Sequence, residues 1–138
     1  MHAAFEMSAQ IAAVDPMVIS LKATVAGQLP ESKLVGLEVA LAEALVNIVV
    51  HAVKPPHDKP VMIEVSLDSE AATFVISDKG VSAPPDLFEN ASSLEMIDTM
   101  AEGGRGLSLI RFFADEVSYS SEAGVNRLTL VFERRESE

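Results

Sequence analysis

The sequence predicts an α+β fold, a two-layer α/β sandwich in which a mixed, mostly antiparallel sheet carries its helices on one face. Segments that alternate between apolar and polar residues follow one another in pairs along the chain, which favours antiparallel hairpins. Segments with apolar residues three and four apart are typical of helices that pack on such a sheet. With 138 residues, the chain is expected to form one domain.

The first half of the chain is expected to contain an edge strand, two helices and a hairpin. Asp15-Pro16 marks a helix start, and Pro30 with Ser32 marks a second one. These elements are, in order, a strand at 3–8, a helix from 15 to about 28, a helix from 30 to about 53, and strands at 61–67 and 72–77. Residues 68–70 form the turn between the two strands.

The second half begins with a segment that shows neither the spacing of a helix nor the alternation of a strand. Residues 81–103 include Pro84-Pro85 and scattered polar groups, and a loop of this length in a compact domain is usually functional, often a lid. A short helix near 94–100 is expected inside it. A helix at 107–114 and a hairpin of strands at 117–121 and 126–133 then complete the chain.

The composition limits the classes of partner. The chain has 10 Lys and Arg against 21 Asp and Glu, a formal charge of −11, which repels phosphate backbones and anionic membranes. We therefore expect neither nucleic acid nor a membrane as a partner. The absence of cysteine excludes disulfides and thiol nucleophiles. The N-terminus lacks the basic and apolar regions of a targeting signal, so a cytoplasmic protein is expected.

Glu43, Asn47 and His51 follow one another at intervals of four residues in the expected second helix. At about 3.6 residues per turn each interval drifts by only about 40°, so the three side chains lie along one face. The neighbouring residues are almost all apolar, and a carboxylate in such a helix is unfavourable unless it is paired or faces a polar site. The stripe is a candidate functional site. The alternative is that it forms the solvent-facing edge of the helix.

Two other segments are candidates for a site. Asp78 follows an apolar strand and precedes Lys79-Gly80, where it serves either a turn or a polar pocket at the edge of the core. The glycine-rich segment 103–106 precedes a helix, where free N–H groups bind phosphate; a simple hinge is the alternative. This segment matches neither the Walker A loop nor the Rossmann fingerprint.

The order and spacing of these segments carry a resemblance to a known superfamily. Three motifs, Glu43-x-x-x-Asn47-x-x-x-His51-Ala52, Asp78-x-Gly80 and Gly104-x-Gly106-Leu107, resemble the N, G1 and G2 boxes of the GHKL (Bergerat-fold) ATPases. The segment "LAEALVNIVVHAV" is similar to the bacterial anti-sigma factor serine-protein kinases within that superfamily. The resemblance covers nearly the whole chain and implies the Bergerat ATP-binding fold.

The resemblance also implies roles for individual residues. Asn47 would bind Mg²⁺, which bridges the nucleotide phosphates, and Glu43 would be the general base. Asp78 would accept a hydrogen bond from the adenine amino group, and Thr129 would support the adenine pocket. His51 is expected to be a structural partner of the stripe. The remaining nucleotide-binding matches are Gly80, beside the base, and Gly104, Arg105, Gly106 and Leu107, around the phosphates.

The function that the resemblance implies is an ATP- and Mg²⁺-dependent serine/threonine-protein kinase. Its substrate would be a small anti-sigma factor antagonist (STAS-type protein), phosphorylated on a serine, and it would also sequester a sigma factor. A homodimer is expected, with the edge strand at 3–8 as a place of contact. Two alternatives remain open: a partner-switch module that transfers no phosphate, and a GHKL ATPase that regulates another signalling protein.

Overall fold

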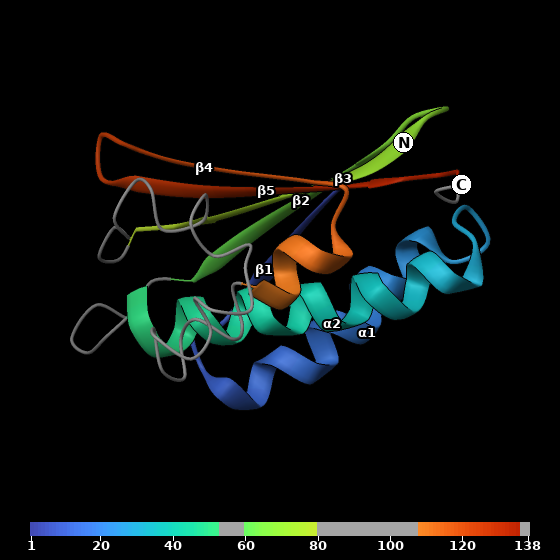
Figure 1. The fold of residues 1–138 in the computed structure, drawn as a ribbon. Coiled ribbons are helices and arrows are strands. Elements are labelled where there is room, and N and C mark those ends of the chain that lie inside the picture. Colours follow the sequence, from blue (N-terminus) through green and yellow to red (C-terminus); the bar gives the residue numbers. More distant parts are fainter. Residues whose placement is uncertain (53–59, 80–107, 136–138) are drawn as a thin grey trace.

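The structure, a computed structural model, describes residues 1–52, 60–79 and 108–135, and it shows helices covering one face of a five-stranded sheet (Figure 1). The elements are β1 (His2–Met7), η1 (Ile11–Ala13), α1 (Val14–Val25), α2 (Glu31–Asn47), the π-helical η2 (Ile48–Ala52), β2 (Val61–Leu67), β3 (Ala71–Asp78), a helix of residues 108–113, β4 (Glu116–Glu122) and β5 (Val125–Glu133). The predicted α+β, two-layer fold is confirmed.

The strand order in the sheet is β1-β2-β3-β5-β4. All four pairings among the described strands are antiparallel, so the sheet is not mixed in this part of the chain, contrary to the expectation. Both predicted hairpins, β2–β3 and β4–β5, are present. The edge strands are β1 and β4, which confirms the edge position predicted for the first strand.

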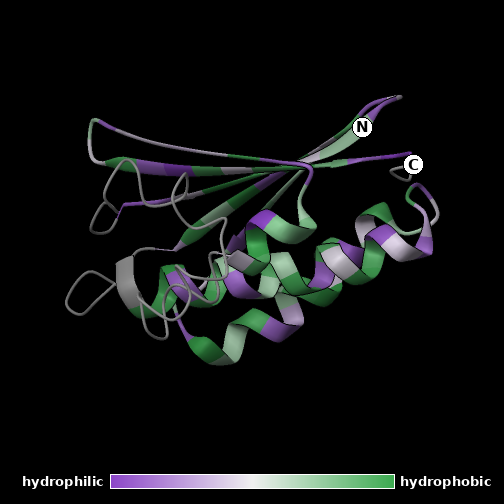
Figure 2. Cartoon of the chain, viewed as in Figure 1, coloured by the Kyte–Doolittle hydropathy of each residue, from purple (hydrophilic) through white to green (hydrophobic). Residues whose placement is uncertain are grey.

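The core lies between the sheet and the helices. Hydrophobic and hydrophilic residues alternate along the strands (Figure 2), and in β3 the buried positions are every second residue. Phe74 of β3 and Phe132 of β5 are both fully buried, and their rings meet edge to face with centroids 5.8 Å apart. Such pairs stabilise a core beyond the area that they bury.

The helix ends differ from the expected ones by a few residues. α1 ends at Val25, before the expected Gln28, because Ala26 is extended and Gly27 has a φ of 86°, a left-handed conformation that glycine adopts without strain. α2 begins after Pro30, as expected, and its α-helical part ends at Asn47. The chain then continues as the π-helical turn η2, a feature that often marks functional sites.

Polar contacts join the elements at the end of the sheet where β2 turns into β3. The Asp68 carboxylate accepts hydrogen bonds from the backbone N–H groups of Glu70 and Ala71 at 2.7 and 2.9 Å, and these bonds hold the pKa of Asp68 below its usual value. Arg134 donates to the backbone carbonyls of Asp68 and Gln28 at 2.8 and 3.1 Å. This turn is therefore tied to the connection between α1 and α2.

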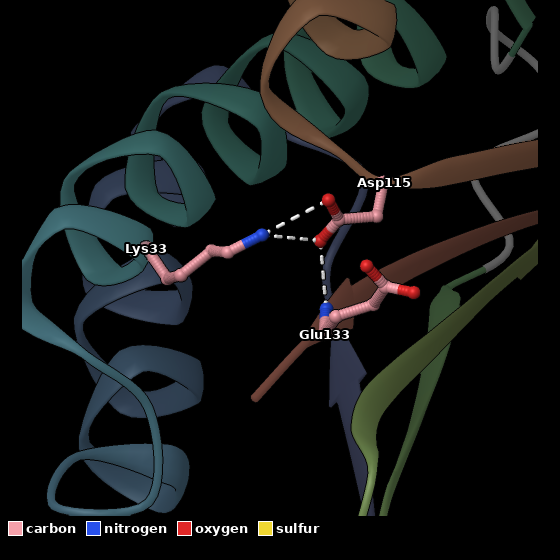
Figure 3. A network of polar contacts seen from close by, with 3 residues as sticks. All are labelled: Lys33, Asp115 and Glu133. Carbon is pink, nitrogen blue, oxygen red and sulfur yellow. Dashed lines mark hydrogen bonds and ion pairs between the residues drawn. The ribbon is translucent and has the colours of Figure 1, made fainter. Parts of the chain in front are cut away.

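A second polar network joins α2 to the sheet (Figure 3). The Lys33 ammonium donates to both carboxylate oxygens of Asp115, at 2.9 and 2.7 Å, and the backbone N–H of Glu133 donates to the same carboxylate at 2.7 Å. The side chains of Lys33 and Asp115 are only 12% and 18% exposed. The pair therefore fixes the start of α2 against the beginning of β4 and the end of β5.

Several predictions concern segments outside the described residues. These are the lid at 81–103, the short helix expected near 94–100, Gly80, and the segment Gly104, Arg105, Gly106 and Leu107. The helix expected at 107–114 is present over residues 108–113. Within the described ranges, no helix has the length and apolar character needed to cross a membrane.

Candidate nucleotide site

One stripe of α2 carries two of the predicted site residues. Glu43 and Asn47 lie one helical turn apart, and both side chains are half-buried. Gly36 and Ala40, both buried, continue the stripe toward the start of the helix at the same three- and four-residue spacing. The stripe is thus not the solvent-facing edge of α2, where Val35 and Glu38 lie instead. The side chain of His51 lies outside the described part of the chain.

One atom of the Asn47 amide is buried without a partner in the described part of the chain. The Nδ2 atom is inaccessible to water and makes no hydrogen bond with a described residue, which is costly for a polar atom in a folded protein. An acceptor such as a phosphate oxygen would satisfy it. If the amide turns by half a rotation, Oδ1 takes the same place and offers the oxygen ligand that Mg²⁺ prefers. The residue therefore fits the group that the resemblance assigns to it.

The carboxylate of Glu43 makes no hydrogen bond or ion pair with any other described residue. Because a half-buried carboxylate without partners keeps its acceptor capacity, Glu43 can take a proton from a hydroxyl group brought beside it. Within the described ranges, no three His, Asp or Glu side chains gather into a metal cluster. A magnesium ion here would be held by Asn47 together with nucleotide phosphates and water.

The helix of residues 108–113 packs on the same stripe of α2. A Cβ atom added to Gly36 would lie 2.8 Å from Cδ1 of Phe113, so the glycine lets the two helices approach closely. This helix begins nearer the C-terminal half of α2 and ends nearer its N-terminal half (Figure 1). The N-terminal end of this helix therefore lies toward the half of α2 that carries Glu43 and Asn47.

Asp78 is the last residue of β3 and is 5% exposed. It shares the helix-covered face of the sheet with Phe74 and Ile76, which are fully buried. Asn126 lies directly opposite in β5, is 3% exposed, and donates a hydrogen bond from Nδ2 to Oδ1 of Asp78 at 2.9 Å. The carboxylate is therefore part of the core edge and not of a solvated turn.

The structure does not bring Thr129 to Asp78. Thr129 pairs with Val75, and both are on the opposite face of the sheet from Asp78, because successive residues of a strand point to opposite faces. The residue that sequence reasoning missed is Asn126. Its signal was the alternation in β5, where Leu128, Leu130 and Phe132 are apolar and Asn126 falls on the same face.

The two parts of the candidate site lie at the same end of the molecule. The C-terminal end of α2, the end of β3 and the turn between β4 and β5 are all on the left in Figure 1. This end presents a helix with an unpartnered amide and a carboxylate, and beside the sheet a buried acidic side chain. Such an arrangement suits a ligand with a polar base at one side and an anionic, metal-binding group at the other.

The comparisons with known proteins agree with this geometry. Residues 7–132 match the histidine kinase-like ATPase domain family, and the chain belongs to this family. The serine/threonine-protein kinase BtrW of Bordetella bronchiseptica is 33% identical over 88 residues, which are 64% of this chain and 62% of BtrW. The serine-protein kinase RsbW of Staphylococcus aureus (strain bovine RF122 / ET3-1) is 35% identical over 96 residues, 64% of this chain and 58% of RsbW.

The matched region thus spans less than two thirds of each of these relatives. The fold is shared with the crystal structure of the RsbU and RsbW domains of Rv1364c from Mycobacterium tuberculosis. That likeness has a TM-score of 0.70 at 16% sequence identity, and it covers 99% of this chain and 34% of that chain. It concerns the arrangement of helices and sheet.

Proposed function

We propose that this chain is an ATP-dependent serine-protein kinase of the anti-sigma factor type. The observation that carries the proposal is the buried Nδ2 atom of Asn47, which has no hydrogen-bond partner among the described residues and lies one turn from the half-buried carboxylate of Glu43. Two kinases that share about a third of their matched residues with the chain support the same activity. We also propose that residues 1–138 form a single ATPase domain and that the protein acts in the cytoplasm.

In this proposal ATP binds with its base at Asp78 and its phosphates near Asn47. Bound Mg²⁺, held in part by Asn47, would offset the charge of the phosphates. Glu43 would accept the proton of a serine hydroxyl on the partner protein. The serine oxygen then bonds to the γ-phosphorus, the bond from that phosphorus to the bridging oxygen breaks, and ADP leaves. Positioning and neutralisation of charge supply most of the rate in such transfers.

The protein substrate would be a STAS-type anti-sigma factor antagonist, and the kinase would sequester a sigma factor when the antagonist is phosphorylated. We further propose a homodimer that uses the edge of β1 with which no other described strand pairs. A monomeric mass by sedimentation at micromolar concentration would contradict the dimer without affecting the kinase proposal.

The test is calorimetry of ATP and ADP with and without Mg²⁺, on the wild type and on Asn47→Ala. We expect binding that requires Mg²⁺ and is lost in the variant. Glu43→Ala should then retain nucleotide binding and lose phosphate transfer to a serine-bearing antagonist. Glu31→Ala is the matched control, because Glu31 is an exposed glutamate in the first turn of the same helix.

The outcomes separate the candidate functions. If neither nucleotide binds the wild type, the proposal is wrong and the chain is a nucleotide-free binding module. If nucleotide binds but Glu43→Ala transfers phosphate as the wild type does, Glu43 is not the base. An ATPase that regulates another signalling protein would hydrolyse ATP and leave the antagonist unmodified.

A further inference from the structure

A row of polar side chains crosses three strands at the edge of the core. Ser121 of β4, Asn126 of β5 and Asp78 of β3 are direct cross-strand neighbours in the register of the sheet. The Ser121 hydroxyl donates to Oδ1 of Asn126 at 2.7 Å, and Nδ2 of Asn126 donates to Oδ1 of Asp78 at 2.9 Å. The row ends on the carboxylate to which the proposed function assigns the adenine base.

Asn126 occupies a position where an apolar residue would stabilise the fold more simply. The next residues on the same face of β5, Leu128 and Leu130, are apolar and buried. Burying an amide gains nothing unless its hydrogen bonds are made. Those hydrogen bonds are made here, and they lead to Asp78. The arrangement therefore constrains that carboxylate.

The two ends of an amide differ, and this difference fixes the orientation of the row. Oδ1 of Asn126 only accepts hydrogen bonds and Nδ2 only donates them. Because the Asp78 carboxylate only accepts hydrogen bonds, Nδ2 is directed toward Asp78, and Oδ1 then accepts the hydrogen bond that the Ser121 hydroxyl donates. A donor on one oxygen holds the plane of the Asp78 carboxylate and keeps the group an acceptor.

We propose that Asn126 is a positioning residue for base recognition, held in place by Ser121, and that it sets a preference for purines with an exocyclic amino group. This inference rests on the proposed nucleotide site. A carboxylate held as an acceptor matches the amino group of adenine. It opposes hypoxanthine, which carries a carbonyl oxygen at the same place, because two acceptors then face each other.

The experiment compares the affinities for ADP and for inosine diphosphate, measured by calorimetry in Mg²⁺. Asn126→Asp is nearly isosteric, removes the donor and sets two carboxylates against each other, so we expect the ADP preference to fall by about tenfold or more. Ser121→Ala removes only the donor that holds Oδ1 of the amide in place, and the preference should fall by about threefold. Ser120→Ala is the matched control, because Ser120 lies on the other face of β4.

The ratio of the two affinities separates positioning from a structural role. A variant that merely loosens the site weakens both nucleotides alike and leaves the ratio unchanged. If thermal denaturation shows that Asn126→Asp is not folded, the affinity ratio of Ser121→Ala tests the positioning role. An unchanged ratio in every folded variant overturns the inference while the nucleotide site stands. If the wild type binds neither nucleotide, the proposed function itself has failed.

Discussion

Lys33→Met should destabilise the protein far more than Lys22→Met, although each variant removes a lysine from an ion pair. The Lys33–Asp115 pair has a distance of 2.7 Å and side chains 12% and 18% exposed. The Lys22–Glu38 pair has a distance of 3.1 Å and side chains 38% and 50% exposed. The two pairs therefore differ in burial and in the hydrogen bonds of the carboxylate, since Asp115 also accepts the Glu133 N–H.

The magnitude follows from charge separation and desolvation. Opposite charges 2.7 Å apart attract by roughly 6 kcal/mol at an effective dielectric constant of about 20. Desolvation of both groups cancels much of this attraction, but removal of one partner leaves the other charge buried, which costs about 3 kcal/mol. The exposed pair is screened by water, and its loss should cost about 0–1 kcal/mol.

The assays are urea denaturation, which gives the free energy of unfolding, and thermal denaturation, which gives Tm, of the wild type, both variants and Lys33→Met/Asp115→Asn. For a chain of this size, a loss of about 3 kcal/mol lowers Tm by roughly 10 °C. The double variant removes the unpaired charge, and its asparagine can still accept the Glu133 N–H, so it should recover about 1–2 kcal/mol relative to Lys33→Met. If Lys33→Met lies within about 0.5 kcal/mol of Lys22→Met, burial does not strengthen this pair and the reasoning is refuted.

Two other predictions concern packing and pH. Gly36→Ala brings a Cβ atom 2.8 Å from Phe113. It should lower the free energy of unfolding by about 1–2 kcal/mol, since overpacking exceeds the gain in helix propensity. In urea denaturation, the double variant Gly36→Ala/Phe113→Leu should recover part of the lost free energy of unfolding. If it recovers none, the ring of Phe113 is not the cause of the destabilisation. Asp68 has a pKa lowered from 3.8 by backbone N–H groups, so its contribution to stability is present above that pH and disappears as the pH falls through its folded value. The Tm difference between wild type and Asp68→Asn should accordingly narrow from about pH 6 to about pH 3, and a constant difference would contradict this assignment.

The fold was largely predictable because its signals are local. The alternation in β2, β3 and β5 and the prolines at the starts of α1 and α2 are signals that lie within single segments of the chain. The Lys33–Asp115 pair was not predictable, since its residues are 82 positions apart and neither segment carries a signal that identifies its partner. The π-helical end of α2 was also missed, because its sequence continues the apolar pattern of the helix.

A strand residue of the candidate site was predictable only where the family motif and the alternation of buried residues along the strand point to the same position. Asp78 satisfies both, because it follows Phe74 and Ile76 on the buried face. Thr129 is a residue type that the family often has at this point, but it does not fit the two-residue alternation of β5. Leu128 and Leu130 on either side of it are buried, so Thr129 faces away from the core. Alternation alone would have excluded Thr129 and selected Asn126. Strand parity is thus a stricter guide to a pocket than a residue type that a family often uses.

The buried ion-pair network and the candidate nucleotide site lie at different ends of the fold. In the β3–β5 register, Ala71 pairs with Glu133 at one end and Asp78 with Asn126 at the other. The first end carries the Lys33–Asp115–Glu133 network and the ties to the β2–β3 turn. The second carries the polar row, and α2 reaches it with its unpartnered amide (Figure 1).

Substitutions at the two ends of the sheet should therefore have different effects. Groups at the first end are mutually satisfied, so their loss should lower stability without changing what the protein binds. In the proposed site the Asn47 amide would gain a partner only when nucleotide binds, so its removal should weaken ligand binding more than folding. Lys33→Met should therefore keep the wild-type ratio of affinities for ADP and inosine diphosphate despite its lower Tm. A changed ratio in that variant would mean that the two ends of the sheet are coupled and that stability effects cannot be separated from recognition.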